Sequence, residues 1–131
     1  MSAPTDPSGP LSGISAIVVE DNWAIASGLR DMLASAGCHV IGMAGNEESA
    51  LALATSGRFD VAILDVQLGA TDVSNVAATV RELEKAIVYV SGFSNLDLLP
   101  ADLRQYARLT KPIDETELVQ AVLASAPTRG H

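Results

Sequence analysis

The stretch AILDVQLGATD, residues 62–72, opens with an apolar run that ends on a single carboxylate, Asp65. A short apolar run of this kind is typical of a strand that is buried on both faces of a parallel sheet. A charged side chain in such a place is costly unless a partner or a cation compensates it. The strand therefore belongs to the core of the fold, and Asp65 marks a candidate functional site at its end.

Apolar runs and helical patterns alternate on both sides of this strand. The predicted strands are residues 14–19, 39–44, 60–65, 86–91 and 106–110. The predicted helices are residues 22–37, 47–57, 73–85 and 114–126, the last with Asp114 as its N-cap. This alternation predicts an α/β fold with a parallel five-stranded sheet and helices on both faces.

The stretch SNLDLLPADLRQ, residues 94–105, interrupts the alternation. Pro100 has no amide proton and disfavours helical angles at Leu99, so no helix should run through this point. We expect an irregular loop followed by a helix of about two turns, from near Pro100 to Tyr106. Because so short a helix is marginal in water, this region should be the mobile part of the domain.

Composition limits the organisation and location of the chain. Residues 1–13 are rich in Pro, Ser and Gly and are interpreted as a flexible tail, residues 14–126 as one domain and residues 127–131 as a second tail. No apolar run is long enough to span a bilayer, and no basic and apolar leader is present, which argues against a membrane or secretory location. The single cysteine, Cys38, excludes an internal disulfide and favours the cytoplasm.

The formal net charge of −8 argues against nucleic acid as a partner, because few side chains could neutralise phosphates. Two interpretations remain, general solubility and a site that attracts metal cations. The positions of the acids decide between them.

Ligands of parallel α/β folds bind beyond the carboxyl ends of the strands. The residues predicted at those ends are Glu20, Asp21, Asp65, Ser91 and Lys111. An isolated acid at a strand end is more often a helix cap or a solvated turn, but here several polar groups meet at one sheet edge. Clustered carboxylates repel one another, and Mg²⁺ prefers such oxygen ligands.

The same set of residues suits phosphoryl transfer. A carboxylate such as Asp65 can act as a nucleophile and form an aspartyl phosphate. The negative oxygens of the phosphoryl group could then be neutralised by Mg²⁺ and by the Lys111 ammonium, with the Ser91 hydroxyl as a donor.

Four segments resemble the signature of response-regulator receiver domains: Val19-Glu20-Asp21-Asn22, Leu64-Asp65-Val66, Val90-Ser91-Gly92 and Thr110-Lys111-Pro112. The resemblance covers residues 14–126. It implies the three-layer flavodoxin-like (βα)5 fold with sheet order 2-1-3-4-5, here with a shortened or irregular fourth helix.

The resemblance also implies a function and a set of site residues. Asp65 would accept a phosphoryl group from a sensor histidine kinase or a phosphotransfer protein, and Ser91 and Lys111 would bind that group. The Mg²⁺ ligands would be Asp21, Asp65 and the backbone carbonyl of Gln67, with Glu20 holding a water molecule.

The segment AIVYVSGF, residues 86–93, resembles the PFxFATGY motif of an alphaproteobacterial receiver subfamily, with Gly92 identical. Arg108 stands three residues before the lysine, where most receivers have an aromatic residue that rotates on activation. We therefore assign Phe93 and Arg108 to a candidate switch surface that contacts a partner.

The resulting hypothesis is a stand-alone response regulator that signals to an unknown downstream protein by docking, or acts in a phosphorelay, without being a turnover enzyme. A receiver-like binding module that takes no phosphate is the alternative, against which the intact Asp65, Asp21 and Lys111 argue. A Mg²⁺-dependent phosphatase of the haloacid dehalogenase class would need Asp-x-Asp, but residues 65–67 are Asp-Val-Gln. A dinucleotide site would need a glycine-rich turn where residues 20–22 are Glu-Asp-Asn.

Overall fold

The computed structural model describes residues 8–69, 71–92 and 99–126. Its elements, in chain order, are β1 (Ser15–Val19), α1 (Trp23–Ser35), β2 (His39–Ala44), α2 (Glu47–Ser56), β3 (Val61–Asp65), β4 (Gln67–Leu68), β5 (Thr71–Asp72), α3 (Ser74–Glu82), β6 (Ala86–Ser91), the 3-10 turn η2 (Ala101–Leu103), β7 (Ala107–Thr110) and α4 (Glu115–Ser125). Within these described ranges, no helix combines the length and the hydrophobicity that crossing a membrane requires.

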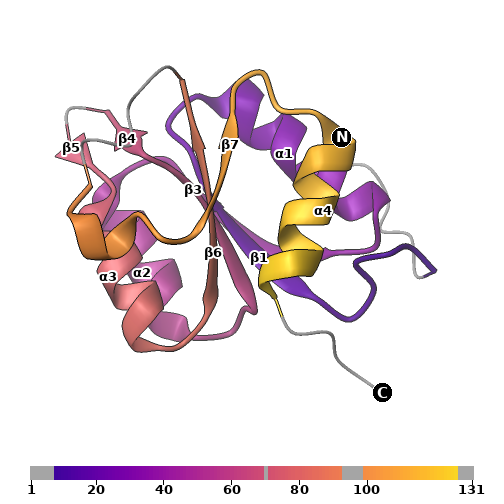
Figure 1. Ribbon diagram of the computed structural model, residues 1–131, viewed down its shortest axis with the longest axis horizontal. Coiled ribbons are helices and arrows are strands. Elements are labelled where there is room, and N and C mark those ends of the chain that lie inside the picture. The colour runs from indigo at the N-terminus through magenta and orange to yellow at the C-terminus, as the bar shows by residue number, and fades with distance from the viewer. Residues whose placement is uncertain (1–7, 70, 93–98, 127–131) are drawn as a thin grey trace.

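The main sheet has five strands in the order β2-β1-β3-β6-β7, and every neighbouring pair is parallel. Counted among these five strands alone, this is the order 2-1-3-4-5, so the predicted flavodoxin-like topology is confirmed. Helices α1 and α4 cover one face of the sheet, and α2 and α3 cover the other (Figure 1). Each face carries its own cluster of buried apolar side chains.

Strand β3 occupies the centre of the sheet, where both faces are covered. All of its residues, Val61 to Asp65, are buried. Its neighbours are β1 on one side and β6 on the other, and Asp65 lies beside Val90 of β6. The apolar run before Asp65 thus places this carboxylate at the middle of the sheet's carboxyl edge.

Side-chain caps fix where α1 and α4 begin, and so where the residues before these two helices lie. The Asn22 side chain accepts hydrogen bonds from the amides of Ala24 and Ile25 and starts α1 directly after the acidic pair that follows β1. Asp114 caps α4 by accepting a hydrogen bond from the Glu117 amide, as the sequence predicts. A capped start satisfies backbone donors that would otherwise lack a partner inside the helix.

The region of the fourth helix is shorter than expected. The predicted helix of about two turns is wrong in length, because only the three residues Ala101–Leu103 are helical, and they form a 3-10 turn. Pro100 precedes the turn with an extended ψ of 150°, so it lies outside the helix rather than at its first position. Leu99 is buried. Residues 93–98, which include the rest of the predicted loop, lie outside the described residues.

The N-terminal segment departs from the predicted tail over residues 1–13. Residues 8–13 form turns, and Leu11 is fully buried in the apolar cluster beneath α1 and α4. Its amide donates a hydrogen bond to the Ala36 carbonyl at 2.7 Å. Gly9 lies so close to the same carbonyl that a Cβ there would be 2.2 Å from the oxygen. The packed part of the domain therefore begins before residue 14, while residues 1–7 lie outside the described residues.

Candidate functional site

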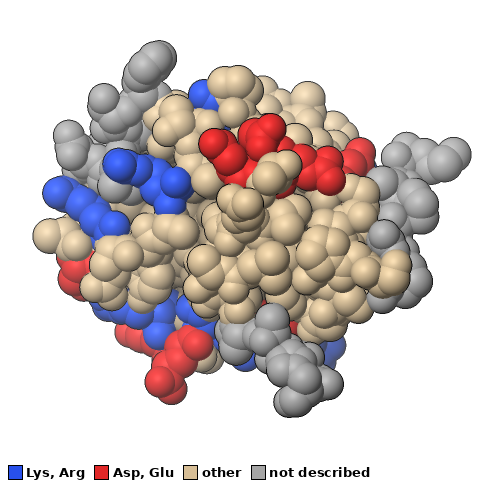
Figure 2. All heavy atoms as spheres, turned by 45° about the vertical axis from the view of Figure 1, so that its right-hand side comes forward, with Lys and Arg blue, Asp and Glu red and all other residues tan. Residues whose placement is uncertain are grey.

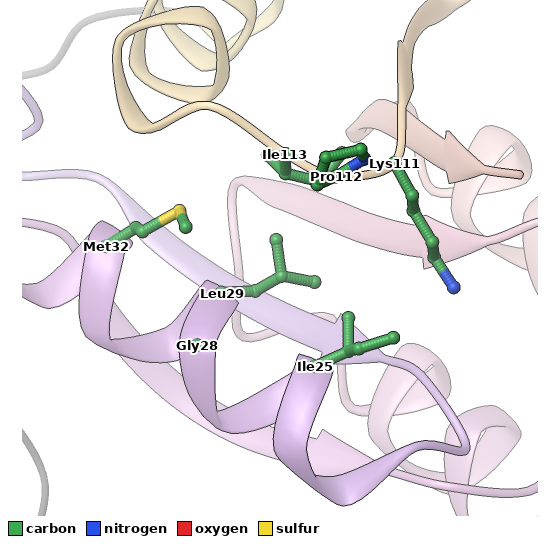
Figure 3. Close-up of a pocket in the computed structure, with 7 residues that line it drawn as sticks. All are labelled: Ile25, Gly28, Leu29, Met32, Lys111, Pro112 and Ile113. Carbon is green, nitrogen blue, oxygen red and sulfur yellow. The ribbon is translucent and has the colours of Figure 1, made fainter.

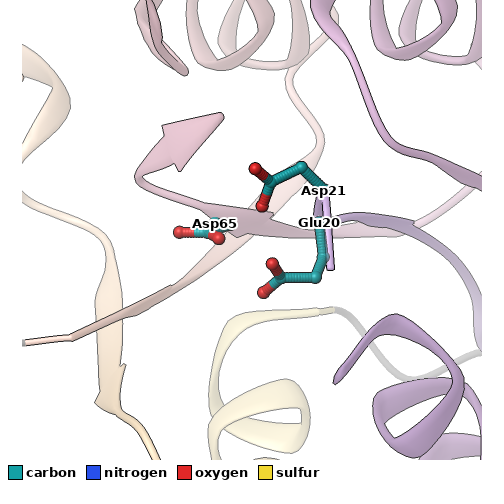
Figure 4. Close-up of side chains that lie close together, drawn as sticks. All are labelled: Glu20, Asp21 and Asp65. Carbon is teal, nitrogen blue, oxygen red and sulfur yellow. The ribbon is translucent and has the colours of Figure 1, made fainter. Parts of the chain in front are cut away.

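Three carboxylates meet at the carboxyl edge of the sheet. Glu20 and Asp21 follow β1, Asp65 ends β3, and one oxygen of each lies within 4.8 Å of the others. Figure 4 shows the three side chains pointing toward one another from two neighbouring segments. Glu20 and Asp65 are only 3% and 4% exposed, whereas Asp21 is open to solvent. The structure thus brings together the acids that the sequence assigned to one edge.

Lys111 joins this cluster from the turn that follows β7. Its Nζ lies 2.9 Å from Glu20 Oε1 and 3.1 Å from Asp65 Oδ2. The backbone amide of Lys111 donates to the Ser91 carbonyl at 2.8 Å, which fixes the turn against the end of β6. Three carboxylates (−3) and one ammonium (+1) leave a formal charge of −2. One divalent cation would balance that charge, and the oxygen donors are those that Mg²⁺ prefers.

Backbone amides hold each of the three carboxylates. The Asn22 amide donates to Glu20 Oε2 at 3.1 Å, and the Gln67 amide donates to Asp65 Oδ1 at 3.2 Å. Since Lys111 donates to Asp65 Oδ2, both oxygens of Asp65 are held in place. Side chains that are fixed in this way do not have to be reordered when a ligand binds.

The third of these amides comes from a residue that no sequence motif singled out. Gly69 donates its amide to Asp21 Oδ2 at 3.2 Å. It follows β4 in the short antiparallel pair of β4 and β5 and has a φ of 64°, a left-handed angle that suits glycine. A glycine between two apolar or β-branched stretches is a turn signal, and this signal could have indicated a hairpin after Asp65.

A shallow depression of about 350 Å³ lies over the cluster, and its walls include Asp21, Asp65, Gln67, Gly92 and Lys111. Gln67 therefore borders the same space as the acids. Ser91 is buried at the end of β6, where it pairs with Thr110 of β7. This places Ser91 at the same sheet edge as Asp65.

The residues of the candidate switch surface lie apart from the cluster or outside the described residues. Arg108 is exposed on β7, where it borders a surface groove with Glu117 and Gln120 of α4. Phe93 lies outside the described residues. Tyr106, two residues before Arg108, has an aromatic contact: its ring meets that of buried Tyr89 edge-on with centroids 6.3 Å apart.

The electrostatics of the cluster are dominated by burial and by Lys111. The pKa of Glu20 is raised from 4.5 to about 7: burial raises it most, the Lys111 ammonium lowers it, and the neighbouring Asp65 raises it. Burial by itself lowers the pKa of Lys111, but its hydrogen bonds with Glu20 and Asp65 raise that pKa above the ordinary value. Lys111 is therefore a permanent cation at neutral pH, while Glu20 exchanges a proton in that range.

This raised pKa predicts how the stability of the metal-free protein depends on pH. Between pH 4.5 and about 7 the folded state holds a proton on Glu20 that the unfolded state has lost. The free energy of unfolding should therefore fall as the pH rises through this window, by on the order of 2 kcal/mol. Thermal melts in EDTA at a series of pH values measure it, and Glu20→Gln should flatten the profile. A stability that rises across the window in wild type would contradict the assignment.

The chain was compared with known proteins. Residues 16–123 match the family model of the response regulator receiver domain. The transcriptional regulatory protein PdtaR of Mycobacterium tuberculosis is 29% identical over 125 residues, which cover 93% of this chain. This chain spans only 61% of the length of that relative.

Solved structures show the same fold. SdrG from Sphingomonas melonis is 30% identical with a TM-score of 0.74, over 95% of this chain and 98% of that one. The receiver domain of the response regulator NarL from Mycobacterium tuberculosis is 29% identical with a TM-score of 0.70, over 86% of this chain and 95% of that one.

Proposed function

Because this chain belongs to the response regulator receiver domain family, we propose that it accepts a phosphoryl group on Asp65 from a histidine kinase or a phosphotransfer protein. The phosphorylated chain then signals by docking to another protein or passes the group on in a phosphorelay. The observation that carries this proposal is the environment of Asp65: a buried carboxylate with one oxygen held by the Gln67 amide and the other by the Lys111 ammonium.

The chemistry follows from these contacts. A carboxylate oxygen of Asp65 attacks the phosphorus of a phosphohistidine, a P–O bond forms, and the P–N bond breaks with its electron pair on the imidazole nitrogen. The new acyl phosphate brings negative charge into a site that already holds three acids. Lys111 keeps its proton, because its pKa is raised, and offers an ammonium to a phosphoryl oxygen. The chain modifies itself and turns over no separate substrate.

Mg²⁺ fits this site on the chemistry of its donors. Asp21, Asp65 and the Gln67 carbonyl would hold it, and Glu20 would act through a water molecule. A backbone amide already holds each of these three acids. When bound, the ion supplies positive charge to the equatorial oxygens of the phosphoryl group. Ser91, at the end of β6, is the proposed hydroxyl donor to the same group, and exposed Arg108 the proposed partner contact.

Phosphorylation by a small donor tests the proposed function directly. Purified protein that is incubated with acetyl phosphate and Mg²⁺ should gain the mass of one phosphoryl group in intact-protein mass spectrometry. EDTA should prevent the gain, and hydroxylamine should reverse it because the product is an acyl phosphate. The alternative function, a binding module that takes no phosphate, predicts no gain under any of these conditions.

Mg²⁺ should also stabilise the fold, because its ligands come together only in the folded chain. At a concentration one hundred times the dissociation constant, the free energy of unfolding should rise by about 2.7 kcal/mol. Asp65→Asn should raise the stability of the metal-free protein, since it removes a negative charge from the cluster while Lys111 keeps its contact with Glu20.

Melting curves of wild type and Asp65→Asn, each with and without Mg²⁺, measure both effects. The variant should gain less from Mg²⁺ than wild type does. Two results together would contradict this: a wild-type melting temperature that does not change with Mg²⁺, and an Asp65→Asn variant that is less stable than wild type without metal. The three acids would then not act as a cation-binding cluster.

A further inference from the structure

The hairpin of β4 and β5 forms one wall of the depression over the acids. Two of its backbone amides, two residues apart, reach carboxylates of the cluster. The Gln67 amide donates to Asp65, and the Gly69 amide donates to Asp21. Asp65 lies just before the hairpin, whereas Asp21 lies 48 residues before Gly69 in the sequence. Gly69 therefore joins the hairpin to a separate segment of the chain, the one that follows β1.

Packing holds the hairpin in place. Leu68 is 3% exposed and belongs to the apolar cluster on one face of the sheet. At the base of the hairpin, the Val73 amide donates to the Val66 carbonyl at 2.9 Å. Near the tip, the Thr71 hydroxyl donates to the Leu68 carbonyl at 3.1 Å. The hairpin's own contacts therefore set the position of its tip, and the contact with Asp21 is not needed for this.

The backbone of Gly69 suits both the turn and the contact with Asp21. Leu68 lies opposite Thr71, so Gly69 is the second residue of a four-residue turn. Its φ is 64°, in the left-handed region that two-residue hairpins require and that glycine adopts without strain. The hydrogen bond of such a turn joins the first carbonyl to the fourth amide. The turn thus does not use the amide of Gly69, which in this protein donates to a carboxylate of the site.

Asp21 depends on its amide more than the other acids depend on theirs. Figure 3 shows the Lys111 side chain extending away from the turn that follows β7, and its ammonium contacts Glu20 and Asp65. Those two acids are buried, whereas Asp21 is exposed. Among the described residues, the Gly69 amide is the only group that donates a hydrogen bond to the Asp21 carboxylate. Loss of this one donor would leave an exposed side chain free to change its rotamer.

A hydrogen bond of this kind favours metal binding. A side chain that is free to rotate loses that freedom when it binds an ion, and the loss weakens binding. An ionised carboxylate has about four lone-pair positions, so one amide on Oδ2 leaves most of them for a cation. Groups that orient a ligating carboxylate contribute to metal affinity in this way. The Gly69 amide should therefore tighten the binding of a cation by Asp21.

We propose that Gly69 is a positioning residue, whose left-handed backbone directs an amide to Asp21 and holds this carboxylate ready to bind Mg²⁺. This inference rests on the proposed function, because it assumes that Asp21 ligates the Mg²⁺ on which phosphorylation of Asp65 depends. It deepens that function by naming what sets the Mg²⁺ affinity: a backbone angle at a residue that contributes no ligand atom.

Substitutions at Gly69 test the backbone angle alone, because a Cβ there would have no atom of the described chain within 4 Å. Gly69→Asn keeps the left-handed angle accessible, whereas Gly69→Val makes it unfavourable. Gly69→Ala is a milder form of the second change, for use if Gly69→Val does not fold.

Gly57→Val is the matched control. Gly57 has a φ of 66°, and a Cβ there would also meet no atom of the described chain within 4 Å. It lies between α2 and the start of β3, at the opposite edge of the sheet from the site. This variant therefore carries the same backbone strain without a change near the acids.

The Mg²⁺ dissociation constant of each protein is measured from the rise of its melting temperature with Mg²⁺ concentration. Figure 2 shows acidic side chains gathered on the face that α4 presents, and Mg²⁺ also screens charges of this kind. NaCl at matched ionic strength is therefore the reference for every titration.

Gly69→Val should raise the dissociation constant by about threefold to tenfold, the range expected for one side chain that must be ordered on binding. Gly69→Ala should raise it by less. Gly69→Asn and Gly57→Val should bind Mg²⁺ as wild type does, although Gly57→Val should melt about as early as Gly69→Val. Labelling of Gly69→Val by acetyl phosphate should be slow at low Mg²⁺ and should reach the wild-type rate at saturating Mg²⁺.

A double-mutant cycle shows whether Gly69 acts through Asp21. In an Asp21→Ala background the amide has no carboxylate to hold, so Gly69→Val should not weaken Mg²⁺ binding further. An equal loss of affinity in both backgrounds would show that the hairpin acts on another ligand, and it would overturn the proposal.

Three other results would also overturn it. Wild-type affinity in Gly69→Val would show that the amide does not position a ligand. Equal weakening in Gly69→Val and Gly69→Asn would show that the backbone angle is not the cause, and equal weakening in Gly57→Val would point to lost stability instead. The proposed function stands in each case if wild type is labelled. A wild type that takes no label at any Mg²⁺ concentration would overturn the proposed function, and the inference with it.

Discussion

Asp65→Ala should lose all phosphoryl incorporation, whether the donor is acetyl phosphate or a histidine kinase. The reaction needs a carboxylate oxygen that is desolvated, oriented and next to a cation, and Asp65 meets these requirements at 4% exposure with Lys111 at 3.1 Å. Glu20 is no substitute, because burial raises its pKa to about 7 and Lys111 holds its oxygen. Asp21→Ala should slow labelling through loss of a metal ligand without abolishing it.

Asp60→Asn is a matched control for this result. Asp60 lies just before the start of β3, is 5% exposed, and accepts a hydrogen bond from the Ser15 amide at the edge of the sheet away from the site. Labelling of this variant should be normal, provided that circular dichroism shows a folded protein. Persistent label at full stoichiometry on Asp65→Ala would place the phosphorylation site elsewhere.

The site could be predicted from the sequence to the extent that it depends on sheet topology. The apolar runs that end at Glu20 and Asp65 are unmistakable strands, and strands that are parallel must bring their carboxyl ends to one edge. Ser91 and Lys111 follow from the same rule, because β6 and β7 extend the sheet beyond β3. These residues are far apart in the sequence, but the sheet topology alone was enough to predict that they lie close together.

Other features depend on contacts that the hydrophobic periodicity of the sequence does not predict. The strands β4 and β5 have two residues each, too few for any alternation, so the hairpin that brings the Gly69 amide to Asp21 was missed. The sequence also did not predict that the Lys111 ammonium lies 2.9 Å from Glu20 Oε1. Whether a lysine contacts one carboxylate or two depends on the detailed geometry of the turn that carries it.

The N-terminal turn is the largest of these departures, and it leads to the second prediction. Leu11→Ala should lower the free energy of unfolding by about 2–5 kcal/mol, the usual cost of a buried leucine. Leu11 is 0% exposed and belongs to the cluster that includes Leu33, Cys38, Leu118 and Val122. Its backbone is held by the Ala36 carbonyl, so the segment cannot move inward to fill the cavity. Urea denaturation of the two proteins measures the difference.

Leu123→Ala provides the control, since Leu123 is 38% exposed on α4 and alanine is at least as good a helix former. Its effect should stay within about 0.5 kcal/mol, as for most surface substitutions. From composition alone, Leu11 is one apolar residue in a tail rich in Pro, Ser and Gly. Both variants would then change the free energy of unfolding by the same small amount. Equal effects would mean that residues 8–13 do not pack on the domain in solution. A large difference would make the turn part of the fold, because only a packed leucine leaves a cavity when it is truncated.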